Sequence, residues 1–348
     1  MNLLASLAKK SFSWNRSVPS TFLWNPSPIP AAESDASQNS AVMACVFWAM
    51  RNAGRATFYV EQNGEQTPHP LTDLLQKPQS KLNPDDRVNL SGREFIGALT
   101  YSRLLDGNAY AHKIRNADGL LIALEWIPHT AIQPVPSPHR ANQLDSYRLA
   151  TPAGQIQVPR EDILHDRDGL DPAHPALGIS RLKSVARHIQ TDNQVAAYSQ
   201  TILSNPIPSL IVSAKSESTR VTQEDAEFIA GKVREATSRD RAGGIIVPTF
   251  PAEITPVGFK PDDLAISHLN KLPEERISAV LGIPAVVAGL GAGLDRATYS
   301  NIKEAREAAT EEFLIPLWQD LADTFTDQLL SEFGNSDGLK VSFSQDRR

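Results

Sequence analysis

The spacing of apolar side chains changes period several times along the first half of the chain. From Ala41 apolar positions recur every three or four residues, which predicts a helix with one buried face. A second helical pattern begins at the N-cap residue Ser91 and ends at Gly107-Asn108, a pair that tolerates the left-handed backbone of a helix C-terminus. Alternation then begins at Ala109 and predicts a helix that feeds a β-hairpin.

Two further turns are predicted in the first half of the chain. Asn63-Gly64 separates two short alternating runs and is a strong hairpin signal. Gly154 separates another pair of predicted strands, and this pair leads to EDILHDRD at residues 161–168. The first half is therefore expected to combine helices with small antiparallel hairpins.

Longer helices are predicted in the second half. Residues 180–204 contain neither proline nor glycine, which predicts a helix about 37 Å long. A strand is predicted at SLIVSA, residues 209–214, and Thr222 to Asp225 forms a capping box that opens another helix. Two more strands are expected, at residues 243–248 (GGIIVP) and 252–259 (AEITPVGF).

Proline divides the last helical patterns. A helix is expected from Asp262, with an interruption at Pro273 after which it continues or a new helix begins. Residues 299–333 keep a three-to-four spacing across Pro316, so we expect one long amphipathic helix with a kink at that proline.

The segment AVVAGLGAGLDRATYSN, residues 285–301, raises the question of a nucleotide site. A dinucleotide loop needs G-x-G-x-x-G between a strand and a helix of a βαβ unit. Here Gly293 comes one position early, Leu294 stands in the required place, and no βαβ unit is predicted around it. The pattern argues against a cofactor.

Composition narrows the possible classes. The 348 residues are 41% hydrophobic and 21% charged, and no apolar run approaches the roughly 18 residues that a membrane span needs. The N-terminal residues lack the order of a secretory signal, so we expect a cytosolic protein. Cys45 is the single cysteine and is expected to be a buried thiol. The net charge of −6 disfavours tight binding of nucleic acid over the whole surface.

Acidic and histidine side chains gather in residues 162–174. Their spacing matches neither an alternating oxygen-ligand loop nor a zinc helix, so we interpret the segment as a polar loop at the end of a strand. G-x-S-x-G and phosphate-binding G-x-x-x-x-G-K motifs are absent. We therefore predict no catalytic residue, no metal site and no cofactor. The acidic and histidine residues of this polar segment are Asp162, His165, Asp166, Asp168, Asp171 and His174.

Several stretches, in order, resemble the portal proteins of tailed double-stranded DNA phages, the head-to-tail connectors of the long-tailed type. The resemblance covers about residues 41 to 330. The leucine-rich helix running into Gly107-Asn108 and the pair of Gly282-Ile283-Pro284 with Ser300-Asn301 are its most specific parts. The full set is HPLTDLLQKP, EFIGALTYSRLLDGNAYAHKIRNADGLLIALEWIP, EDILHDRD, LGISRLKSVARHI, ERISAVLGIPAVVAG and TYSNIKEAREAATEEFLIPL.

The resemblance implies an α+β portal-type subunit with a wing, a helical stem, a small α/β clip and a long kinked C-terminal helix. The short end of the chain leaves little room for a helical crown. The expected parts are an extended N-terminal arm (1–40), a wing (41–178), a stem helix (179–204), a clip (205–258), a second stem helix (259–283), a tunnel loop (284–298), a long wing helix (299–333) and a short C-terminal tail (334–348).

By the same resemblance, the glycine segment lines the narrowest part of a DNA channel. Its glycines would let the loop change conformation cheaply, and the charges of Asp295 and Arg296 nearly cancel, so adhesion to phosphate would be modest. The expected channel-lining residues are Gly289, Leu290, Gly291, Ala292, Gly293, Leu294, Asp295 and Arg296.

The implied function is structural. Copies of the chain, commonly twelve in this family, would form a ring at one capsid vertex, assembled in the host cytoplasm, through which double-stranded DNA is packaged and ejected. The implied partners are the terminase large subunit, neck or adaptor proteins and the major capsid protein. Two alternatives stay open: a nucleotide-dependent enzyme that uses the glycine segment, and a smaller head-completion adaptor.

Overall fold

The computed structural model describes residues 36–80, 89–140, 143–204, 209–214, 222–237, 252–257, 266–294, 299–334 and 336–345. The chain divides into two compact units. The first comprises residues 1–189 and 274–348, and the second comprises residues 190–273. The helices and strands confirm the predicted α+β class.

Helices α4 (Ser40–Ala53) and α6 (Gly92–Asp106) pack together in the first unit, near α5 (Pro70–Gln76). The predicted cap at Ser91 is confirmed, since its Oγ accepts from the Glu94 N–H at 3.3 Å while Glu94 Oε2 accepts from the Ser91 N–H at 2.8 Å. Gly107 ends α6 with a φ of +87°. A Cβ there would lie 2.3 Å from the carbonyl carbon of Ile179, so only glycine fits this position.

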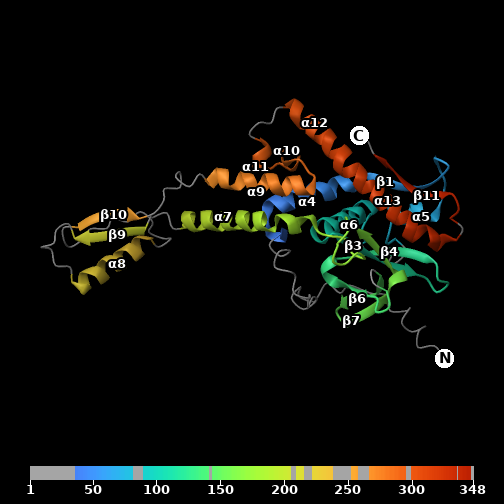
Figure 1. Ribbon diagram of the computed structural model, residues 1–348, viewed down its shortest axis with the longest axis horizontal. Coiled ribbons are helices and arrows are strands. Elements are labelled where there is room, and N and C mark those ends of the chain that lie inside the picture. Colours follow the sequence, from blue (N-terminus) through green and yellow to red (C-terminus); the bar gives the residue numbers. More distant parts are fainter. Residues whose placement is uncertain are drawn as a thin grey trace. The chain divides into compact units, whose positions relative to one another are not determined.

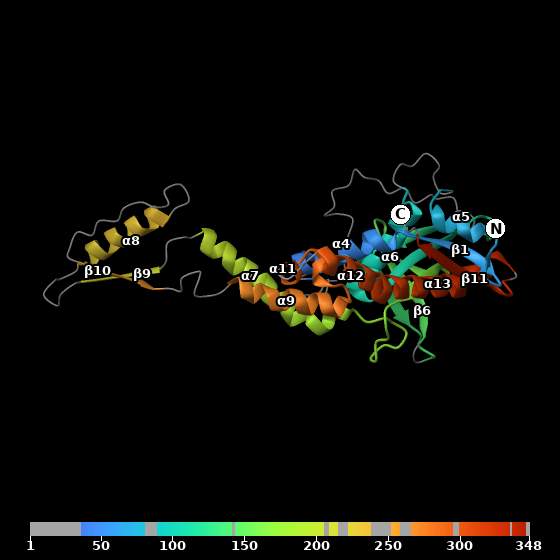
Figure 2. The same cartoon turned by 90° about the horizontal axis from the view of Figure 1, so that it is seen from above.

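One sheet joins the two ends of the described chain. Strand β1 (Ala56–Gln62) pairs with β2 (Glu65–Gln66) through the predicted turn, where Asn63 and Gly64 both have positive φ. On its other side β1 pairs antiparallel with β11 (Leu339–Gln345). The sequence pattern did not predict β11. Figures 1 and 2 both draw β1 and β11 beside the long C-terminal helix.

Two further three-stranded sheets carry the predicted hairpins, and both are antiparallel. In one, the order β4-β3-β8 joins strands β3 (Asn108–Arg115), β4 (Leu121–Ile127) and β8 (Ile163–Arg167). In the other, the order β5-β6-β7 joins β5 (Ile132–Pro136), β6 (Leu144–Thr151) and β7 (Gly154–Pro159). Short 3₁₀ turns, His129–Ala131 and Arg160–Asp162, connect the two sheets.

The predicted C-terminal helix runs without a break but changes its winding before Pro316. Helix α12 (Tyr299–Ala309) leads into a π-helical stretch (Thr310–Leu314), then α13 (Ile315–Leu329) and a final 3₁₀ turn (Leu330–Phe333). Pro316 has no N–H to donate to a carbonyl in the preceding turn, which explains a change of winding at this point.

The larger hydrophobic core of the first unit lies where α13 meets α4 and the β1 sheet. Trp318 is almost fully buried and its Nε1–H donates to the Ala53 carbonyl at 2.9 Å. Phe325 meets Phe58 of β1 edge-on, with ring centroids 5.3 Å apart. Cys45 is buried as predicted, and burial raises the pKa of its thiol to about 12.

Helices α7 (Ala186–Ser204) and α9 (Ile266–Leu281) pass from one unit to the other. The turns before α7 are 3₁₀ (Arg181–Val185), so the predicted long helix begins irregularly. Pro273 lies inside α9 without ending it. The predicted start of α9 at Asp262 lies outside the described residues.

The second unit contains a small α/β element. Strand β9 (Ser209–Ala214) pairs antiparallel with β10 (Ala252–Val257), and α8 (Gln223–Thr237) lies between them in sequence. The predicted capping box of α8 is confirmed by reciprocal hydrogen bonds between Thr222 and Asp225. The predicted strand at 243–248 lies outside the described residues.

Candidate functional site

The predicted channel segment is a compact double turn in the part that the structure describes. Helix α10 (Ala285–Ala288) is followed by Gly289, Leu290 and the short helix α11 (Gly291–Leu294). Asp295 and Arg296 lie outside the described residues. The sequence located this segment but did not predict its two helical turns.

Two of its three glycines have a steric role. Gly289 ends α10 with a φ of +79°, a backbone conformation that other residues rarely adopt. A Cβ on Gly293 would lie 2.2 Å from the Val286 nitrogen, which is far inside contact distance. At Gly291 the nearest atom would be a Glu274 carboxylate oxygen at 3.5 Å, an ordinary contact. The close packing of α10 against α11 therefore requires Gly293, whereas Gly291 is replaceable.

Contacts on both sides anchor the segment. Glu274, on α9, accepts the N–H of Ala292 at 2.8 Å. Ile283 and Leu290 are 1% and 7% exposed and belong to the larger core. Leu294, by contrast, is 50% exposed. The segment thus has a fixed base and an exposed end.

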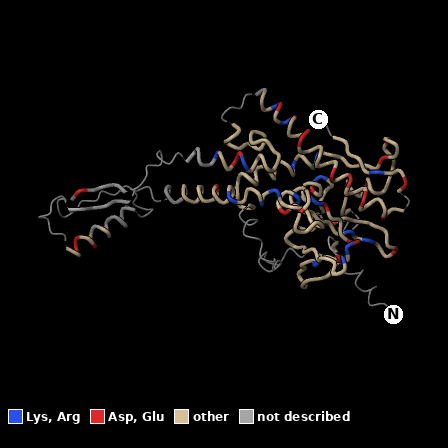
Figure 3. The backbone as a smooth tube through the Cα atoms, in the orientation of Figure 1, with Lys and Arg blue, Asp and Glu red and all other residues tan. Residues whose placement is uncertain are grey.

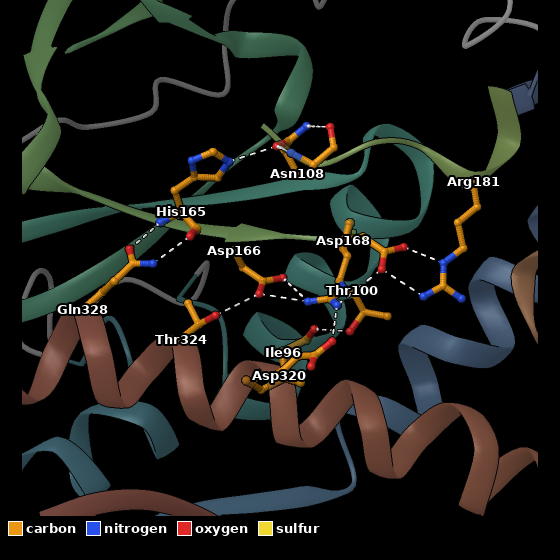
Figure 4. Close-up of polar contacts among 12 residues, drawn as sticks. Ile96, Thr100, Asn108, His165, Asp166, Asp168, Arg181, Asp320, Thr324 and Gln328 are labelled. Atoms are coloured by element: carbon orange, nitrogen blue, oxygen red, sulfur yellow. Dashed lines mark hydrogen bonds and ion pairs between the residues drawn. The ribbon is translucent and has the colours of Figure 1, made fainter. Parts of the chain in front are cut away.

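The buried guanidinium of Arg103, on α6, lies in the same unit between Asp166 of β8 and Asp320 of α13. Both carboxylates are labelled in Figure 4. Arg103 is 4% exposed, and its Nη1 donates to both oxygens of Asp166 at 2.9 Å. Its Nη2 lies 2.5 Å from Asp320 and 3.4 Å from Asp168. Burial opposes the charge of Arg103, but its carboxylate partners outweigh that cost and raise its pKa.

The network continues to the base of α7. Arg181, just before α7, donates to both oxygens of Asp168 at 2.6 and 2.9 Å. A Cβ on Gly282, the residue that follows α9, would lie 3.8 Å from Arg181 Nη1 and 3.7 Å from the Phe313 ring. Arg181, Asp168 and Arg103 therefore form one chain of ion pairs, and Gly282 lies close to Arg181.

Helix α13 and the 3₁₀ turn that follows it present polar side chains every four residues to this side of the sheet. Asp320 and Thr324 contact the Arg103–Asp166 pair, with Thr324 donating to Asp166 at 3.1 Å. Gln328 bonds both backbone groups of His165, accepting at 2.9 Å and donating at 2.8 Å. Glu332 pairs with Lys113 at 3.1 Å. Within this stripe, Gln328 is the residue that bonds the outer edge of β8, at His165.

His165 joins the two small sheets. Its Nδ1 lies 3.0 Å from the Tyr147 hydroxyl of β6, and its Nε2 lies 3.0 Å from Asn108 Oδ1. The Tyr110 ring stacks on it with centroids 4.6 Å apart. Desolvation lowers the pKa of His165 to about 3, so this ring is neutral at physiological pH.

The interpretation of residues 162–174 as a polar loop is wrong for its first half. His165 and Asp166 lie within β8, and Asp166 and Asp168 are 1% and 5% exposed. Their burial is possible because Arg103, more than sixty residues earlier, supplies the opposite charge. Only the downstream part is a loop, where Asp171 accepts the Ala173 N–H at 2.9 Å.

In the described part of the chain, no group of three or more histidine, cysteine or acidic residues is arranged to hold a metal ion. None of the described helices has the length and apolarity to span a bilayer. Figure 3 shows cationic and anionic residues interspersed over the first unit. The described site thus consists of a buried polar network around Arg103 and an anchored glycine segment in the first unit.

The fold is similar to that of solved portal and neck structures. The chain matches "Neck of native GTA particle computed with C12 symmetry" with a TM-score of 0.66 and 18% identity, covering 93% of this chain and 86% of that one. It matches an HK97 family phage portal protein from Corynebacterium diphtheriae with a TM-score of 0.62 and 12% identity, covering 90% and 95%. At these identities the likeness shows the fold, which is that of a portal subunit.

The sequence profile described as phage portal protein matches residues 40–347. The chain belongs to the phage portal protein family. It is also 25% identical over 323 residues to an uncharacterized protein of Rickettsia bellii (strain RML369-C), covering 89% of this chain and 78% of that protein. A second uncharacterized protein, from Rickettsia felis (strain ATCC VR-1525 / URRWXCal2), is 25% identical over 301 residues, covering 82% and 73%.

Proposed function

We propose that copies of this chain form a closed ring of twelve subunits at one vertex of a phage-type particle, through which double-stranded DNA is packaged and ejected. The observation that carries the proposal is the family match over residues 40–347, joined to a fold shared with a particle neck computed with C12 symmetry. The role is structural and needs no cofactor.

In this proposal the expected parts of the chain take portal roles. Residues 41–178 and 299–333 form the wing, α7 and α9 form the stem, and residues 205–258 form the clip that meets the terminase large subunit and later the neck adaptors. The wing contacts the major capsid protein. The net charge of −6 supports passage of DNA without strong adhesion, because few cations are available to hold phosphate.

Residues 284–298 line the channel in this proposal. The exposed Leu294, on a segment held by Glu274 and Leu290, supports the assignment. An anchored base with an exposed end suits a surface that meets moving DNA. The close packing at Gly293 argues against the easy change of conformation within the double turn that its glycines alone suggest.

Negative-stain microscopy and native mass measurement of the purified full chain test the ring. Rings with an axial hole and a mass near twelve times 38.0 kDa are expected. A 38.0 kDa monomer at every concentration, with no rings, would overturn the proposal.

A charge placed on the segment tests the channel lining. Leu294→Arg should reduce the nuclease-resistant DNA per particle several-fold, because a cation on every subunit would hold phosphate in the channel. Leu120→Arg is the matched control, since Leu120 is 56% exposed at the β3–β4 turn. Equal DNA content in the two variants, with rings intact in both, would mean that residues 284–298 do not line the channel.

A further inference from the structure

Strand β7 leaves one edge of the β5-β6-β7 sheet open. Among the residues that the structure describes, β7 pairs with β6 on one side and with no strand on the other. Figure 1 shows β6 and β7 at the margin of the first unit. Every residue of β7 except Val158 is exposed. An open edge presents a row of backbone donors and acceptors that can pair with another chain.

This edge lacks the usual protection. Residues 154–159 (GQIQVP) carry no charge, and their only proline is the last residue. Proteins commonly block such edges with lysine, internal proline or a covering segment. Ile156, which lies two residues from the buried Val158 and so on the same face of the sheet, is 42% exposed. The apolar face of the sheet therefore extends past its own core.

The chain contains a segment suited to this edge. Residues 20–25 (STFLWN) stand between Pro19 and Pro26, carry no charge, and are rich in residues that favour strands. Their length equals that of β7. Phe22 and Trp24 would project from one face of such a strand, where either can cover Ile156. These residues lie in the N-terminal 35 residues, outside the described part of the chain.

We propose that residues 20–25 of one copy add to the β7 edge of a second copy as an extra strand. Residues 26–35 carry proline at positions 26, 28 and 30, a composition that favours an extended spacer, and at about 3.1 Å per residue they could span about 30 Å. A reach of this length would allow the strand to leave its own subunit. This inference rests on the proposed ring, in which every copy would donate one strand and receive one.

Disulfide trapping in the full-length chain tests the pairing. Gln155→Cys is combined with a single cysteine at each of residues 21 to 24 in turn, which covers the possible registers. The natural Cys45 is fully buried and does not compete. Under mild oxidation we expect a ladder of covalent multimers in denaturing gels for at least one register. Gln66→Cys on the edge strand β2 is the matched control and should give no ladder.

Each outcome separates this inference from the ring itself. Rings seen by microscopy without any cross-link would overturn the inference and leave the proposed function standing. A cross-link confined to single chains would overturn the exchange between copies. Multimer ladders in samples without rings would support strand exchange and contradict the ring.

Hydrogen exchange gives an independent measurement on the intact assembly. Those amides of residues 155–157 that point away from β6 should exchange about tenfold faster or more in Leu23→Pro than in the natural chain, because proline removes a donor and disfavours the added strand. Ser11→Pro, in the same N-terminal segment, should leave these amides unchanged. Equal exchange in all three chains would overturn the proposal.

Discussion

The two small sheets of the first unit close their edges in different ways. In β4-β3-β8 the outer edge of β8 is bonded by the Gln328 amide, and Leu124 of β4 donates to the Pro78 carbonyl at 2.8 Å. In β5-β6-β7 the β7 edge is open and exposed in the described chain. The first sheet thus has contacts from its own chain at both outer strands, whereas no described strand pairs with the outer edge of β7. Their responses to matched substitutions should therefore differ.

The largest difference in the free energy of unfolding between matched substitutions in the two sheets is expected at two arginines. Arg103→Met should lower the free energy of unfolding by about 3–5 kcal/mol, because it leaves Asp166 buried without its counter-charge. Arg148→Met, on an exposed position of β6, should change it by less than about 0.5 kcal/mol. Urea denaturation measures both. Equal losses would mean that the Arg103 network does not stabilise the first sheet.

Two glutamines give the next test. Gln328→Ala removes both hydrogen bonds to the His165 backbone and should cost about 2–3 kcal/mol, since two buried backbone groups lose their partner. Gln155→Ala, on the exposed β7 edge, should cost under about 0.5 kcal/mol. Hydrogen exchange at the His165 amide should rise in Gln328→Ala. An unchanged exchange rate would show that another group closes that edge.

Acid should loosen the junction between the two sheets at His165. The folded protein holds this histidine neutral with a pKa of about 3, whereas in the unfolded chain it binds a proton near pH 6.5. The unfolded state therefore binds more protons, and this contribution to stability is full above pH 6.5 and declines as the pH falls toward 3.

Between pH 7 and 5.5 the loss from His165 amounts to about 1 kcal/mol. The measurement is the difference in pH slope between the natural chain and His165→Asn, because His69 and His112, whose pKa values burial also lowers, contribute equally to both. The slope should be shallower in His165→Asn. Identical slopes would mean that a group other than His165 causes the loss of stability in acid.

How much of the fold and of the candidate site the sequence predicts depends on how far apart in the chain the interacting residues lie. The Ser91 cap, the Gly107 helix end and the Asn63-Gly64 turn were predicted, because each depends on residues within one turn. Arg103 and Asp166 are 63 residues apart, and Arg103 and Asp320 are 217 apart, so no local sequence pattern predicts their pairing. Without that partner, an acidic run is expected in solvent, which is why the loop interpretation failed.

The glycine segment shows the same limit at shorter range. Its position followed from the glycines themselves and from the resemblance to portal proteins. The reason for Gly293 did not, because it depends on how α11 folds back on Val286, seven positions earlier. Strand β11 was missed because its partner, β1, begins more than 280 residues before it. Pairing over such a distance is decided by the tertiary fold.

The smallest effect is expected at Ile156. Ile156→Lys should change the free energy of unfolding by less than about 0.5 kcal/mol in dilute samples of the chain, because the lysine can extend from the exposed edge into water. Leu121→Lys is the matched change on β4, also an edge strand, where the side chain is 4% exposed. It should cost several kcal/mol, because it buries an unpaired charge. If Ile156→Lys cost more than about 1 kcal/mol under conditions in which the chain is monomeric, β7 would already be covered within its own subunit, and the contrast between the two sheets would fail.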